Sequence, residues 1–485
     1  MTPYDAGAGT AFPVEPLSPD DLDKVHAQAM RLLSDVGTEV HDDEMLQRLR
    51  AAGQRVDDTR VRWDPDWVLD QLRLAPSGFT LTGRNPERSV RIGGGSLVHV
   101  PVGGPPFAHD EERGRRDGSI ADHIELVKLE HASDRLQVLQ SGTVEAQDLD
   151  ADHRHLQMDY SILRWSDRPY IVYGSSGPKA RDGFELAALA SGGRDRLAEH
   201  PMTLGIVNPN SPLVWDGLMV GQLAACADYA QPVAITPFLL AGASAPVTLA
   251  AGLSLLVAET LSGVAMAQLV RPGAPCILGT FVTGVDMRSG GPSLGLPEFV
   301  LATLAGGQIA RRYGLPLRGG GGLCSGIPLD AQSATETAMS LWATHLAGCD
   351  LVVHAAGWLE GGLVASYEKL ALDLEVLRMF DRMRQGIVVD DDTLAFDAIA
   401  ETGPGGLFLA HDHTLERFRT EAFMSPLFRS NAFPTWTKQG APSAEHIAAG
   451  EWHRLLESYV DPGIDEGLDQ ALTELVERRT AELLA

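Results

Sequence analysis

The chain has few cysteines, and none of them are spaced as a metal-binding or redox pair. The four are Cys226, Cys276, Cys324 and Cys349. Because no CxxC pair occurs and the chain is long, the sequence argues against a disulfide scaffold and a structural zinc domain.

The chain also lacks a surplus of positive charge. It has 39 Lys and Arg residues against 65 Asp and Glu residues, a formal net charge of −26. Binding to nucleic acid depends on basic residues that release counterions from phosphates, so no nucleic acid partner is expected. The negative field would favour a cationic substrate, although it serves solubility equally well.

No segment reads as an export signal or a membrane span. The N-terminus, MTPYDAGAGTAFPVEPLSPDD, has no basic region followed by an apolar core. The longest apolar stretch, residues 247–270, is interrupted by Glu259, Ser262 and Gln268. We therefore expect a cytoplasmic protein that does not bind a membrane.

What the chain does have is a repeat of strand-like segments, each followed by a helical pattern. The clearest are MTLGIVNPNSP, PVAITPFLLAGASAP, PCILGTFVTGVD, LPLRGGGGLCSG and DLVVHAAGWLEGG. Each starts with apolar, often β-branched residues, as strands buried on both faces do, and each ends in small, polar or aromatic residues.

Counting such units predicts the fold. The expected strands are residues 97–102, 136–142, 169–174, 203–208, 232–238, 275–281, 315–320 and 350–356. The expected helices are residues 119–132, 152–165, 180–191, 215–229, 247–270, 296–313, 330–347 and 366–385. Eight units without GxGxxG at the first turn favour an α/β fold of the (β/α)8 TIM-barrel type over a doubly wound open sheet.

The chain is expected to divide into three regions. Residues 1–95, with amphipathic helices at 22–36 and 43–52, are predicted to form a helical and turn-rich cap. Residues 96–415 are predicted to form the barrel, and residues 416–485 a helical extension packed on it.

Several long segments carry a family resemblance. They are VNPNSPLVWD, ITPFLLAGASAPVTLAAGL, LVRPGAPCILGTF, DMRSGGPSLGLPE, AGWLEGGLVASYEKL, ETGPGGLFLAHDHT and APSGFTLTGRNPERSVRIGGG. In them the chain resembles the trimethylamine methyltransferase family over residues 20–480. The resemblance implies a (β/α)8 barrel that transfers a methyl group from a methylated amine to cob(I)alamin on a separate corrinoid protein.

The resemblance also bears on the methyl donor. Some members carry pyrrolysine after the glycines of the seventh strand, where this chain reads CSGIPLDAQSATE, so it resembles a non-pyrrolysine member. Methyl transfer is an in-line displacement that depends on alignment and on the leaving group. A quaternary ammonium leaves as a neutral amine without a proton. Since similar members act on glycine betaine, proline betaine or carnitine, the resemblance favours a betaine-like donor, glycine betaine first.

Candidate site residues follow the strands, because ligands bind at the carboxyl ends of strands in such folds. His354 and Glu360 are predicted to be catalytic, His354 by donating a hydrogen bond or orienting a neighbour. The substrate cage is predicted to contain Glu145, Tyr173, Asn208, Phe238, Phe281 and Trp358. The rim facing the acceptor is predicted to contain Asn210, Arg318, Cys324 and Asp330.

Each candidate also has a plain structural interpretation. His354 is equally compatible with a core histidine, Phe238 and Tyr173 with core packing, and the two asparagines with turns. Glu145 is compatible with a solvated loop acid.

Two motifs suggest other ligands only weakly. RGGGGLCSG, residues 318–326, lacks the GK[ST] ending of a phosphate-binding loop. HDHT, residues 411–414, has no third ligand at helical spacing, and we expect no catalytic metal.

Two other functions stay open on the sequence. Tetrahydrofolate is an alternative direct acceptor, entering near Arg288, Arg318 and Lys369. A non-catalytic methylamine-binding or sensing protein is the second alternative. The cap and the helical tail also suggest a homo-oligomer.

Overall fold

The computed structural model describes residues 14–485 and is built around an eight-stranded parallel sheet. In spatial order its strands are β6 (Val98–His99), β19 (Leu351–Val353), β18 (Leu317–Gly320), β15 (Cys276–Gly279), β13 (Val233–Ile235), β11 (Thr203–Val207), β10 (Tyr170–Ile171) and β9 (Leu139–Gln140). The first strand in sequence therefore lies beside the last. The backbone N–H groups of Gln137 and Val138, just before β9, donate to the carbonyl of His99, so the two edges of the sheet meet.

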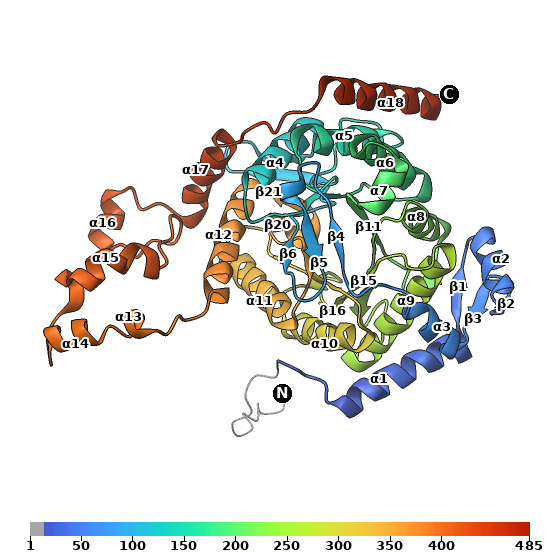
Figure 1. Cartoon of the computed structure of the whole chain (residues 1–485), viewed down its shortest axis with the longest axis horizontal. Helices are drawn as coiled ribbons and strands as arrows, with labels where there is room; N and C mark the ends of the chain where they lie inside the picture. The colour runs from blue at the N-terminus through green and yellow to red at the C-terminus, as the bar shows by residue number, and fades with distance from the viewer. Residues whose placement is uncertain (1–13) are drawn as a thin grey trace.

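Helices alternate with these strands and surround them (Figure 1). They are α4 (Ile120–Ala132), α5 (Arg154–Trp165), α6 (Gly177–Ser191), α7 (Arg194–Glu199), α8 (Gly217–Asp228), α9 (Leu249–Val270), α10 (Pro297–Tyr313), α11 (Ala331–Ala347) and α12 (Tyr367–Arg384). The predicted parallel strands and the helix that follows each of them are confirmed. The sequential strand order, closed on itself, is not that of a doubly wound sheet.

A hairpin closes the amino end of the barrel. It consists of β4 (Phe79–Leu81) and β5 (Val90–Ile92), and it crosses the middle of the ring of helices in Figure 1. Leu81 and Ile92 are fully buried in a cluster that includes inward side chains of the strands, such as Ile171. This apolar plug leaves the carboxyl end as the open end.

Two small sheets stand at the carboxyl end, next to the strands that lead into them. One joins β14 (Phe238–Ala241), β16 (Phe281–Val285) and β17 (Pro292–Ser293). The other joins β20 (Trp358–Leu359), β21 (Val364–Ser366), β7 (Phe107–Asp110) and β8 (Gly114–Asp117). They extend the wall of the barrel beyond the strand ends.

The N-terminal region packs on the outside of the ring. It contains α1 (Pro19–Arg31), continued by a π-helical turn at Leu32–Val36, then β1 (Thr38–Val40), α2 (Asp43–Ala51), β2 (Arg55–Asp57), β3 (Arg60–Arg62) and α3 (Pro65–Leu72). β1 also pairs with β12 (Val214–Trp215). Both α1 and α3 contact α9. Helix α9 is long and apolar enough to cross a membrane, but 83% of its most apolar window is buried in the fold, as in the core helix of a globular protein.

The C-terminal region has two parts of different character. Residues 387–443, called the arm below, contain α13 (Asp391–Leu394), α14 (Phe396–Thr402), a short 3₁₀ turn (Phe408–Ala410), α15 (Asp412–Glu421) and α16 (Phe433–Lys438). The arm projects away from the ring in Figure 1. Then α17 (Ala444–Glu457) packs on α12 and α4, and α18 (Glu466–Leu484) packs on α5 and α6. The predicted boundary at residue 415 falls inside α15, and the division into three domains stays a prediction.

Candidate functional site

A cavity of about 410 Å³ lies at the open, carboxyl end of the barrel. The predicted residues that line it are Glu145, Tyr173, Asn208, Phe238, Phe281, Arg318, His354 and Trp358. They come from loops and strand ends distributed around the whole barrel. The structure thus brings together every predicted cage residue, although the role of each stays a prediction.

Phe238 and Phe281 form an aromatic pair because of strand register. β14 and β16 are parallel and place these two residues directly opposite each other. Their ring centroids lie 4.6 Å apart, within the range of favourable tilted pairs. Phe281 is buried, whereas Phe238 remains 39% exposed at the opening. The pair therefore runs from the interior of the cavity to its mouth.

Glu145 presents an oriented carboxylate to the same cavity. Its Oε2 accepts a hydrogen bond of 2.8 Å from the Tyr173 hydroxyl, and Arg154 Nη1 lies 3.4 Å away. Burial raises the pKa of Glu145, while Tyr173 and Arg154 oppose that rise. Asp159 fixes Tyr173 in turn by accepting a 3.1 Å hydrogen bond from its backbone N–H. Glu145 is thus a held anionic group and not a freely solvated loop acid.

His354 follows β19 in a strained conformation. Its φ is +62°, a region that non-glycine residues rarely adopt and that often marks functional sites. Its Nδ1 lies 3.2 Å from the backbone N–H of Gly103 and accepts that hydrogen bond, so the ring proton belongs on Nε2. Burial lowers the pKa of His354 well below its usual range, with the charge of Arg318 adding to the effect. The ring is therefore a neutral donor, and its centroid lies 4.5 Å from that of Trp358.

A buried ion pair supports the loop that carries Trp358. The Lys369 ammonium lies 2.5 Å and 2.6 Å from the two carboxylate oxygens of Asp373, and both side chains are almost fully buried. Asp373 also accepts a 2.9 Å hydrogen bond from the N–H of Gly357. The pair fixes the turn between His354 and Trp358.

Four predicted residues do not line the cavity, and each has a structural contact that explains its position. Glu360 pairs with Arg115 at 3.1 Å, and Asp330 caps the start of α11. Asn210 forms a bridge with Val214. Cys324 is buried, and its thiol donates to the carbonyl of Trp358 at 3.1 Å. These side chains shape the surrounding loops.

Arg318 is placed differently from its predicted position on the rim. It lies within β18 and is 3% exposed, so it belongs to the floor of the cavity. The other two cations of the predicted folate entrance are already paired, Lys369 with Asp373 and Arg288 with Asp286. They do not form a basic rim.

Sequence reasoning missed four polar residues that line the cavity: Gln140, Ser175, Gln222 and Thr236. Gln140 and Thr236 stand in or beside apolar strands, and a polar residue in such a run is a usable signal. Gln222 comes from α8 and reaches the cavity past Gly174, where a Cβ would lie 2.1 Å from its amide nitrogen. No sequence pattern predicts that Gln222 reaches the cavity past Gly174.

The HDHT motif is structural in this fold. The ring of His411 accepts from the N–H of His413 at the start of α15 and lies 3.3 Å from Glu401. Across residues 14–485 there is no group of three or more His, Cys, Asp and Glu side chains that could hold a metal ion.

The chain is an α/β barrel with a cavity at its carboxyl end, the end at which barrel enzymes bind their substrates. The family model described as trimethylamine methyltransferase (MTTB) matches residues 6–484. The chain therefore belongs to the trimethylamine methyltransferase family, and the predicted methyltransferase class is confirmed.

Individual relatives are similar along almost the whole chain. A glycine betaine methyltransferase of Desulfitobacterium hafniense (strain Y51) is 36% identical over 467 residues, covering 96% of this chain and 97% of that protein. A proline betaine:corrinoid methyltransferase of Eubacterium limosum is 29% identical, covering 86% and 87%. The crystal structure of the Methanosarcina barkeri monomethylamine methyltransferase has a TM-score of 0.54 at 11% identity, covering 92% and 88%, and this likeness concerns the fold alone.

Proposed function

We propose that this enzyme removes a methyl group from a betaine-like quaternary ammonium compound, glycine betaine first, and passes it to a corrinoid protein. The observation that carries the proposal is the cavity wall, which combines the held carboxylate of Glu145 with the rings of Tyr173, Phe238, Phe281 and Trp358. The 36% identical relative is named for glycine betaine, and two others are named for proline betaine and carnitine with a corrinoid.

Such a wall suits a permanent cation. Each aromatic face contributes about 0.5–2 kcal/mol to the binding of a quaternary ammonium group. Glu145 adds an opposite charge, held in place by Tyr173. The cage aligns the methyl group and excludes water, and the in-line geometry lowers the barrier to displacement.

The reaction asks for little acid or base chemistry from the protein. The new bond forms to the methyl carbon, the carbon–nitrogen bond breaks, and its electron pair stays on nitrogen. The product is a neutral tertiary amine, so no proton is needed. This agrees with a neutral His354, which we assign to hydrogen bonding and not to proton transfer. Glu360 is assigned to holding Arg115 near the mouth.

The mouth of the cavity fits an acceptor carried by another protein. A corrinoid protein would supply cob(I)alamin as the nucleophile. Gly103, Gly104 and Gly361 line the cavity beyond the strand ends and present no side chains that would block a flat macrocycle. We assign Asn210, Cys324 and Asp330 to shaping these loops. The folate route finds less support, since Lys369 and Arg288 are paired.

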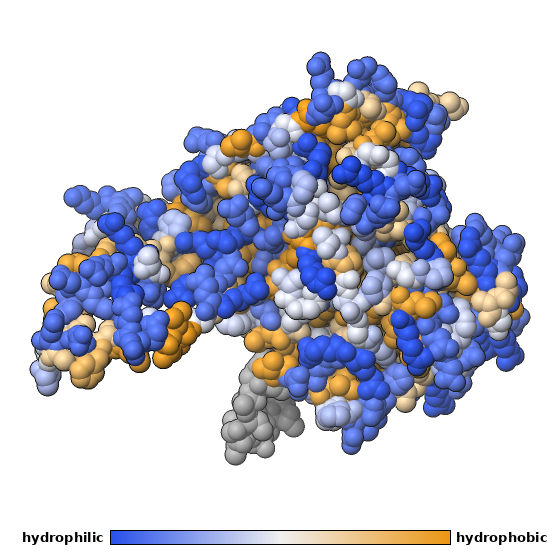
Figure 2. All heavy atoms as spheres, in the orientation of Figure 1, coloured by the Kyte–Doolittle hydropathy of each residue, from blue (hydrophilic) through white to orange (hydrophobic). Residues whose placement is uncertain are grey.

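We further propose that the enzyme is a homo-oligomer assembled through the arm. The arm exposes large apolar side chains along its length: Ile387, Val388, Val389, Leu394, Phe396, Ile399, Leu407, Phe408, Leu409, Leu415, Phe418, Met424, Phe428 and Phe433. In Figure 2 hydrophobic residues lie among hydrophilic ones on the arm. So many exposed apolar side chains in one segment are typical of an interface.

A second copy of the chain is the occupant that we assign to the arm. The outer faces of α11 and α12 expose Met339, Trp342, Leu346, Met379 and Met383. This second apolar surface lies on the body, from which the arm projects away in Figure 1. One copy's arm covering another copy's α11–α12 face would bury both surfaces. Since the four thiols are free and buried, we place the assembly in the reducing cytoplasm.

One assay tests the function. Glycine betaine, proline betaine, carnitine and trimethylamine are each incubated with the full chain and either a reduced corrinoid protein or tetrahydrofolate alone. Both products are then measured by mass spectrometry. Dimethylglycine formed only with the corrinoid protein is the expected result. Demethylation with tetrahydrofolate alone selects the folate route, and binding without turnover selects a sensor.

A further inference from the structure

The floor of the cavity holds a positive charge with no partner. Arg318 is 3% exposed, and its Nε and Nη1 atoms are fully buried without a hydrogen-bond partner within residues 14–485. Arg318 also lines the cavity. Its neighbours across the sheet are Gly279 and Leu351, neither of which offers a polar side chain. The guanidinium is therefore buried at the cavity floor, and two of its nitrogen donors lack an acceptor.

An unpaired buried guanidinium is costly, so the arrangement calls for a ligand that neutralises it. Burial lowers the pKa of Arg318 only to about 10, so the group stays charged at neutral pH. The ligand chemistry that matches a planar fork of donors is a carboxylate, which accepts two parallel hydrogen bonds.

Two other titratable groups, Glu145 and Cys349, do not neutralise Arg318. Glu145, the carboxylate among the lining residues, is bound to Tyr173 and Arg154. The nearby Cys349 thiol has its pKa raised by burial and stays protonated. His354 adds a second donor, because its Nδ1 is occupied by Gly103 and its Nε2–H is left for a ligand.

We propose that Arg318 and His354 form a carboxylate subsite, so that the donor is a dipolar quaternary amine carboxylate that enters carboxylate first. The identity of the cationic end rests on the proposed function, whereas the anionic subsite rests on Arg318 itself.

The subsite also fixes which end of the donor meets the acceptor. Arg318 lies at the floor, and Phe238, 39% exposed, lies at the opening. In strand order, β19 and β6 separate β18, which carries Arg318, from β9, whose loop carries Glu145. A donor held by Arg318 thus extends across the barrel toward Glu145 and turns its methyl groups to the mouth. Trimethylamine has no group that could reach Arg318.

The test uses three ligands of nearly equal size and calorimetric titration of the full chain without acceptor. Glycine betaine carries both charges, 3,3-dimethylbutanoate keeps the carboxylate but replaces nitrogen by carbon, and choline keeps the cation but lacks the carboxylate. The wild type is expected to bind glycine betaine more tightly than choline and to bind 3,3-dimethylbutanoate measurably. Choline bound as tightly as glycine betaine overturns the subsite without any variant.

Variants of Arg318 sharpen the test. Arg318→Gln is expected to weaken the binding of glycine betaine and of 3,3-dimethylbutanoate about 10- to 100-fold, as expected for loss of a charged hydrogen-bonding partner. The Kd of choline should change by no more than about threefold. The affinity of Arg318→Lys for the two carboxylates should fall between those of the wild type and Arg318→Gln. Arg194→Gln, on the outer surface in a pair with Asp228, is the control and should change none of them. Equal losses for all three ligands would mean a packing role and overturn the proposal.

Stability gives a second readout. Arg318→Met removes an unpaired buried charge and should raise the unfolding temperature of the ligand-free protein, whereas replacing a merely structural arginine would lower it.

The outcomes also distinguish the carboxylate subsite from the proposed function. Arg318-dependent binding of both carboxylates without methylation of any acceptor keeps the subsite and rejects the methyltransferase route. Demethylation of glycine betaine with an unchanged KM in Arg318→Gln keeps the function and rejects the subsite.

Discussion

The cavity and the arm use the same kinds of side chain in opposite ways. In the cavity, strand register and buried hydrogen bonds hold Phe281 and Trp358 in fixed positions against a small polar space. In the arm, Phe396 and Leu409 are more than 70% exposed on short helices with few contacts to the body. The first region holds its side chains in place around a small cavity, whereas the second leaves them exposed for the second copy that we propose as its partner.

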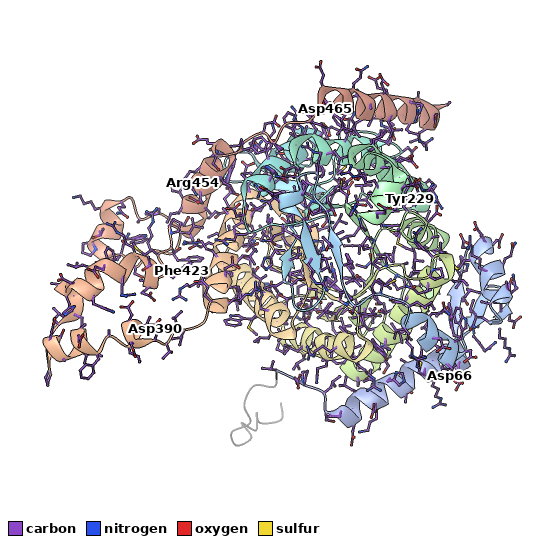
Figure 3. The ribbon with its side chains drawn as sticks, viewed as in Figure 1. Asp66, Tyr229, Asp390, Phe423, Arg454 and Asp465 are labelled. Atoms are coloured by element: carbon purple, nitrogen blue, oxygen red, sulfur yellow. The ribbon has the colours of Figure 1, made fainter. Side chains whose placement is uncertain are left out.

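The largest expected difference between the regions concerns ion pairs. Lys369→Met leaves Asp373 buried without its partner and should lower the free energy of unfolding by about 3–5 kcal/mol. The arm pair Arg417–Asp392 is the matched control, because Asp392 is largely exposed. Arg417→Met should leave the free energy of unfolding nearly unchanged. Chemical denaturation followed by fluorescence checks both, and equal effects would remove the contrast between the two regions. Figure 3 shows Asp390 of the arm away from the ring that contains Tyr229, whereas the ring of Phe423 lies 4.3 Å from the guanidinium of Arg378 on α12.

The next largest effect is expected on assembly. Phe396→Asp combined with Leu409→Asp places two charges on the arm surface, and burying each of the original side chains is worth about 1.5–3 kcal/mol. The double variant should dissociate at micromolar concentration while its barrel unfolds at the wild-type temperature. Analytical ultracentrifugation of the full chain reads the mass. An unchanged mass, or a monomeric wild type, contradicts the assignment of a second copy.

Within the cavity, Glu145→Gln should weaken binding of a quaternary amine about 10- to 100-fold, because it removes the opposite charge while keeping the shape and the contact to Tyr173. Binding of 3,3-dimethylbutanoate should change far less, since it has no cationic end. Titration calorimetry measures both ligands. Comparable losses would show that Glu145 serves only to hold the fold.

A smaller effect is expected on the pH dependence of stability. Glu259 accepts hydrogen bonds from the Leu213 N–H and the Ser211 hydroxyl, and burial raises its pKa to about 6. Because the folded pKa lies above the unfolded value of 4.5, protonation of Glu259 stabilises the folded state. This stabilisation is complete below pH 4.5 and is lost as pH rises through about 6. Glu259→Gln should remove this decline, at most about 2 kcal/mol. Thermal unfolding between pH 4 and 7.5 measures how the unfolding temperature changes with pH. Parallel curves for the wild type and Glu259→Gln would contradict the raised pKa of Glu259.

The smallest effect is expected from a single ring. Phe238→Ala should raise the Kd of a quaternary amine about 2- to 30-fold more than that of its neutral carbon isostere, the size of one cation–π contact. Phe428→Ala in the arm is the control, since its ring is 44% exposed and does not line the cavity. Equal losses for the cation and the isostere would reduce Phe238 to packing.

The strands and the cage residues could be read from the sequence for a simple reason. Buried parallel strands are apolar throughout, so runs such as TLGIV and CILG stand out, and their following residues necessarily meet at one end. Phe238 and Phe281 each stand at the end of such a run and are predicted in the cage on that argument; the register of β14 and β16 sets them side by side.

Other features depend on three-dimensional relations that a linear pattern does not encode. In LPLRGG nothing indicates whether the arginine points into the barrel or out, so Arg318 was assigned to the rim and not to the floor. Gln222 enters the cavity from a helix through a gap left by Gly174. Residues 416–485 are predicted to form a helical extension packed on the barrel; α17 and α18 pack on the ring, whereas the arm projects away from it. Its apolar side chains instead face outward, and the partner that would cover them is outside a single chain.

The hairpin of β4 and β5 has a kinetic consequence. Because Leu81 and Ile92 seal the amino end, the methyl donor enters and the demethylated product leaves by the same opening that the acceptor must occupy. Under the proposed function, turnover is therefore expected to be ordered: the donor binds first, the acceptor docks second, and the demethylated amine leaves only after the acceptor has dissociated. Such an order predicts that the spent amine competes with the donor and that excess acceptor slows the cycle.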